Sequence, residues 1–493
     1  MKKAHTIVLR LLVVSCAFAV FTQCKNKPKD NPPSSEETGK ITPVDLPEIV
    51  PGFNFPEQDS VINGWLNDTS FAGNYDSVSI YNHAWGIWAG LTDPTNQKYA
   101  GDKLLVFETW MGLGEVQDII EAGGTACDTS YGKTHRTPLT RPKQFEHSAR
   151  FAGFHPKQLT GVASEDGFSQ WVTVSYSPEA ACFSTKNQIF KQSVINRSYV
   201  ENGFGAIPQF PNSAITIKPT YLVYKDTNEL LQVPVWLDAP NPPDSFSVNR
   251  FPYCVYVDMT NKQKKDKKLK PVLTNVTDAK AIEEATCNLD DFIYFKVDAK
   301  MAALMNHEDS VQGLSGAGGA TAGQIALLVG MHVTTKEISN WTWQTYYWTP
   351  DPENPGTPSS ALAVKTRPKQ LKGAAGHYAA VAAYAMLLPN GANNKTKGAM
   401  GLFGYNPYLE GGFGPNTFSL DNKFKKDFQY GQQTNCMSCH ILALPSPAAQ
   451  YGTDQYIDTL DPSLYKNQVR LDFAWSIQTA LINDTVPYWQ FKK

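Results

Sequence analysis

The chain has 493 residues, of which 42% are hydrophobic and 18% are charged, so it can bury a large core and global disorder is excluded. The formal net charge is −2 and no long basic stripe occurs, which argues against nucleic acid as a partner. The 35 Gly and 33 Pro residues predict many turns and long connections rather than a helical bundle.

The first 24 residues have the features of an export signal. Two lysines precede a mostly apolar run, residues 7–22, which is shorter than the roughly 20 apolar residues of a membrane-spanning helix. The run ends just before Cys24, where the composition changes to a polar segment rich in Pro and Ser. This pattern resembles a bacterial lipoprotein signal, in which the cysteine becomes the lipidated first residue of the mature chain.

The resemblance implies an exported protein that a lipid on Cys24 anchors to a bacterial membrane, facing the periplasm or the cell surface. We expect residues 1–24 to be the signal peptide and residues 25–60 to be a polar tether. Cys16 is a competing lipidation site, and a plain cleaved secretory signal is the alternative to a lipoprotein signal.

Residues 61–310 have the pattern of a mixed α/β region. Helices are predicted around residues 78–90 and 116–122. Several runs of β-branched and aromatic residues alternate with Pro, Asn and Asp turns, which predicts an antiparallel sheet. These runs are residues 171–176, 215–224, 230–236, 253–259 and 292–297.

Residues 311–493 form the second predicted region. A buried strand is predicted at residues 326–333, and alternating aromatic and polar residues at 340–348 predict a half-buried strand or an aromatic pocket wall. The Ala-rich residues 371–386 are predicted to be helical. A terminal helix is expected over residues 467–482, where apolar residues recur at helical spacing.

A Cys-x-x-Cys-His motif lies near the C-terminus, at residues 436–440. On one helical turn, residues three apart share a face, so Cys436 and Cys439 can both reach the two vinyl groups of one haem. The adjacent His440 then becomes the proximal iron ligand. A redox dithiol does not need this histidine, and a zinc site needs a second ligand pair. We therefore predict one covalently attached haem c.

The sixth iron ligand is not settled by the motif. The 53 residues after His440 contain no Met and no His, so this ligand comes from upstream or the distal position is open. His332, in the predicted buried strand, is the first candidate, because a strand would hold it rigidly. His377 and Met400 are the alternatives.

Four other cysteines lie between the export signal and the haem motif: Cys127, Cys182, Cys254 and Cys287. An oxidising compartment allows two disulfides among them, with three possible pairings. Buried free thiols are the alternative.

Four phrases of the sequence occur together in one group of proteins. Met331-His332 is followed by Trp341-x-Trp343, then by residues 404–410 (Gly-Tyr-Asn-Pro-Tyr-Leu-Glu), then by the haem motif. In this order they resemble large bacterial monohaem cytochrome c-like lipoproteins with a C-terminal haem motif. The resemblance implies that Cys436 and Cys439 form the thioethers and that His440 ligates iron. It supports His332 and implies no particular reaction.

These observations together predict an α+β fold with an antiparallel β region and a helical C-terminal haem-binding portion. We expect haem binding and electron transfer, with redox partner proteins. A haem enzyme of peroxidase or oxygenase type, with an open distal site, is one alternative. A haem-bearing sensor or binding module is another.

Overall fold

The structure is a computed structural model, and it describes residues 41–68, 70, 75–128, 136–142, 167–225, 230–265, 267–311, 319–387, 402–415, 417–418, 429–446, 451, 457 and 461–491. The export signal, Cys24, residues 25–40 of the expected tether and the ligand candidate Met400 lie outside the described residues. The remainder of the expected tether, residues 41–60, includes packed side chains. The ring of Phe53 is buried and lies over Gly86, where a Cβ atom would be 2.1 Å from it.

The main sheet contains eight described strands, which all pair antiparallel. The strand order is β15-β14-β13-β7-β5-β3, with β12 also pairing with β13 and β4 with β7. Its strands are β3 (Met111–Gly112), β4 (Phe168–Val172), β5 (Ser175–Tyr176), β7 (Ile215–Tyr224), β12 (Tyr294–Lys296), β13 (Ile325–Thr335), β14 (Thr342–Trp348) and β15 (Tyr378–Ala382). The predicted α+β class with a large antiparallel sheet is confirmed.

Smaller sheets accompany the main one. The larger of them is β8 (Leu230–Val235), β9 (Tyr253–Asp258), β10 (Val272–Leu273) and β11 (Thr286–Asn288), with β11 parallel to β9. The pairs are β1 (Pro94–Tyr99) with β2 (Asp102–Leu105), and β6 (Phe204–Ala206) with β16 (Gln468–Arg470). Strands therefore lie at all five of the predicted β runs between residues 171 and 297.

The helices are short apart from α2 and α8. Among the described residues they are α1 (Asp59–Leu66), α2 (Ser77–Leu91), α3 (Leu113–Glu121), α5 (Pro178–Asn187), α6 (Gln192–Arg197), α7 (Ala279–Glu284), α8 (Ala299–Val311), α9 (Ala361–Thr366), α10 (Cys436–His440), α11 (Pro462–Tyr465) and α12 (Trp475–Thr479). The 3₁₀ helices are η1 (Val106–Thr109), η3 (Val248–Arg250), η4 (Leu289–Asp291), η5 (Gly373–His377), η7 (Gly431–Gln433) and η8 (Tyr488–Gln490). No helix among the described residues has the length and apolar character needed to cross a membrane.

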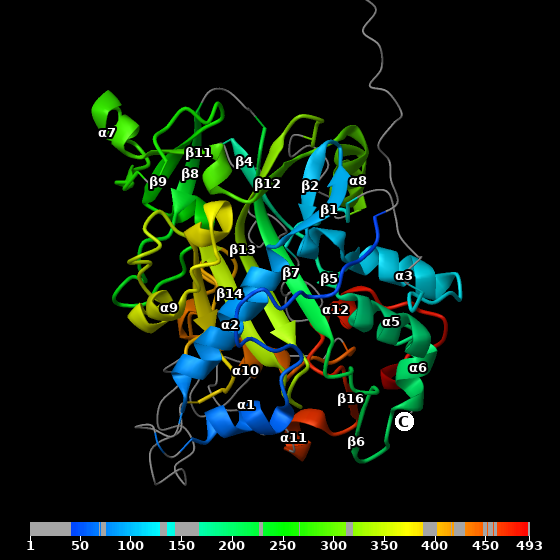
Figure 1. The fold of residues 1–493 in the computed structure, drawn as a ribbon. Coiled ribbons are helices and arrows are strands. Elements are labelled where there is room, and N and C mark those ends of the chain that lie inside the picture. The colour runs from blue at the N-terminus through cyan, green and yellow to red at the C-terminus, as the bar shows by residue number, and fades with distance from the viewer. Residues whose placement is uncertain are drawn as a thin grey trace, which may run out of the picture. The chain divides into compact units, whose positions relative to one another are not determined.

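Helix α2 covers one face of the main sheet and crosses in front of β14 in Figure 1. The rings of Trp88 and Tyr346 stack with their centroids 4.4 Å apart, and the Tyr346 hydroxyl donates to the Ala84 carbonyl. Side chains alternate between the two faces of a strand, so Trp343 and Thr345 lie on the opposite face from Tyr346. All seven residues of β14 are buried, and the expectation that this strand is half-buried is therefore wrong.

The predicted helix at residues 371–386 is also wrong. This segment forms η5 and then β15, which pairs with β14 at the edge of the main sheet. Alanine favours helices only weakly, and five backbone pairs with β14 override that preference. The small side chains suit this place because Ala382 packs against Ile80 and Ala84 of α2.

The terminal helix expected over residues 467–482 is reduced to the single turn of α12. Asn467, Asp472 and Phe473 have φ values of 58°, 46° and 68°, which an α-helix does not tolerate. Between these residues the chain forms β16, which runs parallel to β6. The two regions predicted as 61–310 and 311–493 share the main sheet, because β13 pairs with both β7 and β12.

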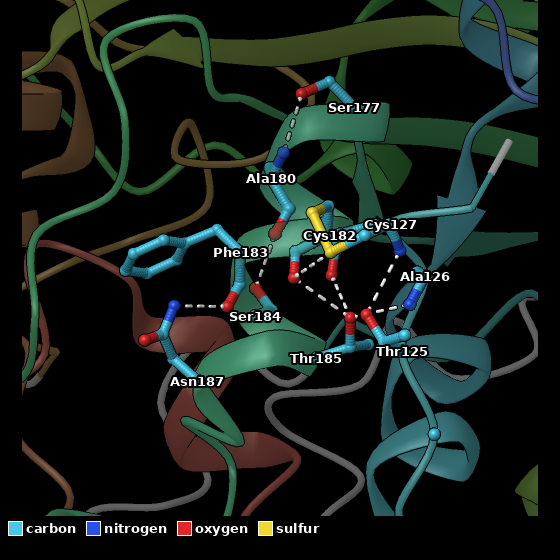
Figure 2. The surroundings of a disulfide bond; sticks show 12 residues. Thr125, Ala126, Cys127, Ser177, Ala180, Cys182, Phe183, Ser184, Thr185 and Asn187 are labelled. Atoms are coloured by element: carbon cyan, nitrogen blue, oxygen red, sulfur yellow. Dashed lines mark hydrogen bonds between the residues drawn. A yellow bond between two sulfur atoms is a disulfide. The ribbon is translucent and has the colours of Figure 1, made fainter.

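One disulfide joins Cys127, which follows α3, to Cys182 of α5 (Figure 2). The Thr185 hydroxyl oxygen accepts a hydrogen bond of 2.8 Å from the backbone N–H of Ala126 beside it. Cys254 and Cys287 are buried free thiols. Cys287 lies opposite Val257, three residues along β9 from Cys254, which is about 10 Å and beyond the reach of a disulfide.

We predict that replacing Cys127 and Cys182 together by Ser lowers the free energy of unfolding by about 2–4 kcal/mol, because the unfolded chain regains the freedom of a long loop. Denaturant unfolding measures this loss. Alkylation of unfolded, unreduced protein followed by mass spectrometry should label Cys254 and Cys287 and leave Cys127 and Cys182 unlabelled. Labelling of Cys127 or Cys182 under these conditions would contradict the assignment.

Candidate functional site

A cavity of about 460 Å³ lies against the face of the main sheet that α2 does not cover. Its volume is in the range of sites that hold cofactors and small ligands. The cavity wall includes the two cysteines and the histidine of the Cys-x-x-Cys-His motif, and also ionisable side chains from elsewhere, among them Arg141, Glu308 and Asp472. Three more of them, Lys218, His332 and Glu410, lie on the sheet and on the turn beside it.

The sheet contributes two rows of side chains to this wall. Residues that face each other on neighbouring strands lie on the same side of a sheet. The register places Lys218 of β7 opposite His332 of β13, and His332 opposite Thr345 of β14. The next row toward α10 ends in Trp343, whose ring centroid is 4.4 Å from that of His440.

Helix α10 is held at its N-terminus by Asn435, which is almost fully buried. The side-chain oxygen of Asn435 accepts hydrogen bonds from the N–H groups of Met437 and Ser438, which caps the helix. Its amide group donates to the carbonyls of Ala385 and Leu402. One residue therefore both starts the helical turn and fixes it to the neighbouring chain.

Both thiols of the motif face the cavity and neither is in a disulfide. The Cys436 thiol donates to the Gly404 carbonyl over 3.1 Å. Burial, with a smaller contribution from the negative charge of Glu410, raises the pKa of Cys439 to about 12 and that of Cys436 well above its ordinary value. Both groups are therefore neutral thiols at neutral pH, whereas catalytic dithiols have a lowered pKa.

The imidazole of His440 is oriented by a backbone carbonyl. Its Nδ1–H donates to the carbonyl oxygen of Phe473 over 2.8 Å, which leaves Nε2 with the lone pair. None of the described residues bonds to Nε2, and His440 lines the cavity. Burial lowers the pKa of His440 to about 3, so the ring is neutral and Nε2 can act as a ligand.

The Phe473 carbonyl is aimed by an unusual turn. Asp472 and Phe473 both have positive φ, a conformation that is costly for residues other than glycine. The carboxylate of Asp472 holds the turn: one oxygen is 2.6 Å from the ammonium of Lys336, and the other accepts from the N–H of Phe210 over 3.0 Å. Both charged side chains are at least 92% buried.

The segment at residues 404–410 positions a carboxylate at the cavity. Asn406 is completely buried, and its amide donates to the Thr345 hydroxyl and to the Tyr346 carbonyl on β14. Its backbone N–H donates to one carboxylate oxygen of Glu410 over 2.7 Å. The turn therefore fixes Glu410 to the centre of the main sheet.

Glu410 binds His332 across the cavity wall. The other carboxylate oxygen accepts from His332 Nε2 over 2.9 Å, and no described residue bonds to His332 Nδ1. The two side chains are 18% and 19% exposed, so a molecule in the cavity can reach them. Burial alone would raise the pKa of Glu410, but His332, the Asn406 N–H and Lys218 outweigh it and lower this pKa. Burial lowers the pKa of Lys218 to about 8, against the opposing effect of Glu410.

Four of the residues singled out in the sequence, Cys436, Cys439, His440 and His332, line this one cavity. The alternative ligand His377 does not line it: its Nε2 is 3.6 Å from Asp291, and its ring is 6.3 Å from that of Trp348.

Sequence reasoning did not assign Lys218 or Glu410 to the site. Lys218 could have been noticed as a charged residue inside the otherwise apolar run of β7. Glu410 could have been noticed as the last residue of the sequence Gly-Tyr-Asn-Pro-Tyr-Leu-Glu at residues 404–410.

No group of three or more His, Cys, Asp or Glu side chains in the described part of the chain could hold a bare metal ion. A haem requires less of the protein, because the porphyrin itself supplies four nitrogen ligands. Its requirements are two thiols on one helical face, a neutral imidazole with an available nitrogen, and a cavity beside them. The described residues fit these requirements. Comparisons with protein families, with curated proteins and with solved structures find no match.

We predict that Gly330→Ala lowers the free energy of unfolding by about 1–3 kcal/mol, because a Cβ atom at Gly330 would be 2.7 Å from the anchored amide of Asn406. The matched control is Gly64→Ala in α1, where a Cβ atom meets nothing within 4 Å and a gain of about 0.5–1 kcal/mol is expected. Equal effects of the two substitutions on denaturant unfolding would refute this account.

We predict that Asp472→Asn lowers the free energy of unfolding by about 3–5 kcal/mol, because the buried ammonium of Lys336 loses its counter-charge. The control is Glu284→Gln, which removes an exposed ion pair with Lys270 and should cost less than about 1 kcal/mol. Adding Lys336→Met to Asp472→Asn should restore part of the stability. If the double variant is less stable than Asp472→Asn, the charge argument fails.

Proposed function

We propose that this protein binds one haem covalently through Cys436 and Cys439, with His440 as an axial iron ligand, and carries electrons. The observation that carries the proposal is the orientation of His440. Its Nδ1–H is committed to the Phe473 carbonyl, and its Nε2 lies at a cavity whose wall also includes both thiols. In metal-bound histidines, a hydrogen bond from the ring nitrogen that does not bind the metal fixes the tautomer and the direction of the ring.

The state of the two cysteines supports thioether formation. Addition of a thiol to a vinyl group consumes an S–H group, and both cysteines are protonated and oriented on one turn of α10. The Cys436 N–H is bonded to the Gly404 carbonyl, and the Trp475 indole N–H donates to the Cys439 carbonyl. The backbone around both sulfur atoms is therefore fixed before any group enters the cavity.

The surroundings of His440 support a redox role. A haem supplies a reversible one-electron change of its iron, with a potential that depends on the axial ligands and on burial. Aromatic side chains lie directly at the His440 ring, with Trp343 against it and Phe473 next to Trp343. The lipoprotein-like signal adds that the haem protein is exported and anchored to a bacterial membrane, where redox proteins would be its partners.

The experiment is expression of the full chain in a bacterium that matures c-type cytochromes. The wild-type protein should keep its haem in a denaturing gel and gain the mass of one haem. The double variant Cys436→Ala/Cys439→Ala should lose the covalent haem completely, because no thioether can form. His440→Ala should keep the thioethers and show a changed ferric spectrum, because the iron loses an axial ligand.

The control is Cys287→Ala, which removes a buried free thiol that does not line the cavity. This variant should attach haem as the wild-type protein does. A colourless wild-type protein, or a double cysteine variant with covalent haem, would refute the proposal.

A further inference from the structure

We propose that the cavity also reduces hydroperoxides, and that His332 is the catalytic residue that transfers the proton when the O–O bond breaks. This inference rests on the proposed haem at His440. Several ionisable side chains line the same cavity, and electron transfer alone gives no role to the adjacent Lys218, His332 and Glu410 among them.

The His332–Glu410 pair has the properties of a proton-transfer group. Glu410 accepts the Nε2–H of His332, so Nδ1 carries the lone pair and is the basic nitrogen of the ring. The carboxylate stabilises the positive charge that the imidazole gains when Nδ1 takes a proton. The Asn406 N–H holds the second carboxylate oxygen of Glu410, so the pair has a fixed position.

The orientation of His332 is the reverse of that of His440. In His440, Nδ1, the ring nitrogen nearer to Cβ, is hydrogen-bonded to the Phe473 carbonyl, and the farther nitrogen, Nε2, is available. In His332 the far nitrogen is bonded to Glu410, and only the nitrogen next to Cβ is available. A porphyrin plane at Nδ1 would press against the side chain's own Cβ, and β13 cannot move back because β7 and β14 hold it on both sides. His332 therefore suits a proton-transfer role better than iron ligation.

The charges of the cluster indicate the class of ligand. Lys218 and Glu410 have opposite charges. The other charged side chains of the described lining are Arg141, which is paired with Asp309, Asp472, which is paired with Lys336, and Glu308, so the described lining has no excess of positive charge that would favour an anion over a neutral molecule. Nδ1 of His332 accepts a hydrogen bond, and Lys218 lies directly across the strand pair from it. A hydroperoxide has an O–H group that can donate to Nδ1 and a second oxygen that can accept a proton. Carbon monoxide carries no proton, so its binding would not involve proton transfer by His332.

The reaction balances as ROOH with two electrons and two protons giving ROH and water. His332 Nδ1 takes the proton from the O–H oxygen and delivers it to the other oxygen. The O–O bond breaks, and that oxygen leaves as ROH. The remaining oxygen becomes water with two protons from solvent and two electrons, which a reduced electron-carrier protein supplies one at a time.

The test compares wild-type protein with His332→Gln, both loaded with haem, in stopped-flow optical experiments. The second-order rate constant for hydrogen peroxide should fall by about 10²–10⁴-fold, the usual contribution of a positioned proton-transfer group. Association of hydrogen cyanide, which must also lose a proton to bind, should slow in the same variant. Binding of carbon monoxide to the reduced protein should not change, and the ferric spectrum should remain that of the wild-type protein.

Two further variants separate a proton-transfer role from a structural one. Glu410→Gln should show a smaller loss with peroxide, because the imidazole keeps Nδ1 but loses its charged partner. His377→Gln, which lies outside the cavity, should react like the wild-type protein. An unchanged peroxide rate in His332→Gln, equal slowing of carbon monoxide, or a changed ferric spin state would overturn the inference and leave the haem proposal intact. A wild-type protein without haem would overturn both.

Discussion

The hydrogen bond from His440 Nδ1 to the Phe473 carbonyl is the interaction on which the site depends. It determines which ring nitrogen is available, and it requires a backbone turn with two consecutive positive φ angles. Such a turn is unfavourable by itself, and the buried Asp472–Lys336 ion pair offsets its cost. The strain is thus located next to the carbonyl that orients the imidazole of His440. No regular helix continues through this segment, because Asn467, Asp472 and Phe473 all have positive φ angles.

The main sheet separates an apolar layer on one face from the side chains that line the cavity on the other face. On one face, α2 packs its tryptophans against Tyr346 and seals the core. On the other face, the same strands carry Lys218, His332 and Trp343 toward the cavity. Because neighbouring strands hold β13 and β14 on both sides, the cavity side chains have little freedom to move. Their positions are set by strand register, which makes the site preorganised before any ligand enters.

The two histidines at the cavity are held in opposite ways. A backbone carbonyl holds Nδ1 of His440, and a carboxylate holds Nε2 of His332. The carbonyl leaves Nε2 of His440 available for ligation, whereas the carboxylate leaves Nδ1 of His332 as the nitrogen that can take a proton. With the proposed haem bound, a cavity with one histidine of each kind would couple a one-electron change to the movement of a proton. This coupling connects the proposed electron-carrying and peroxide-reducing roles, since the second needs the first.

The motif at Cys436–His440 could be predicted from sequence, because its residues lie within one helical turn whose geometry is local. Strands β7 and β13 could also be predicted, because their apolar runs indicate buried strands. The hydrogen-bond partners of the two histidines could not be predicted in this way, because Phe473 is 33 residues from His440 and Glu410 is 78 residues from His332, and only the folded chain brings them together. The predicted helices at 371–386 and 467–482 failed for the same reason: strand pairing and a strained turn, both set by distant residues, outweighed local helix preference.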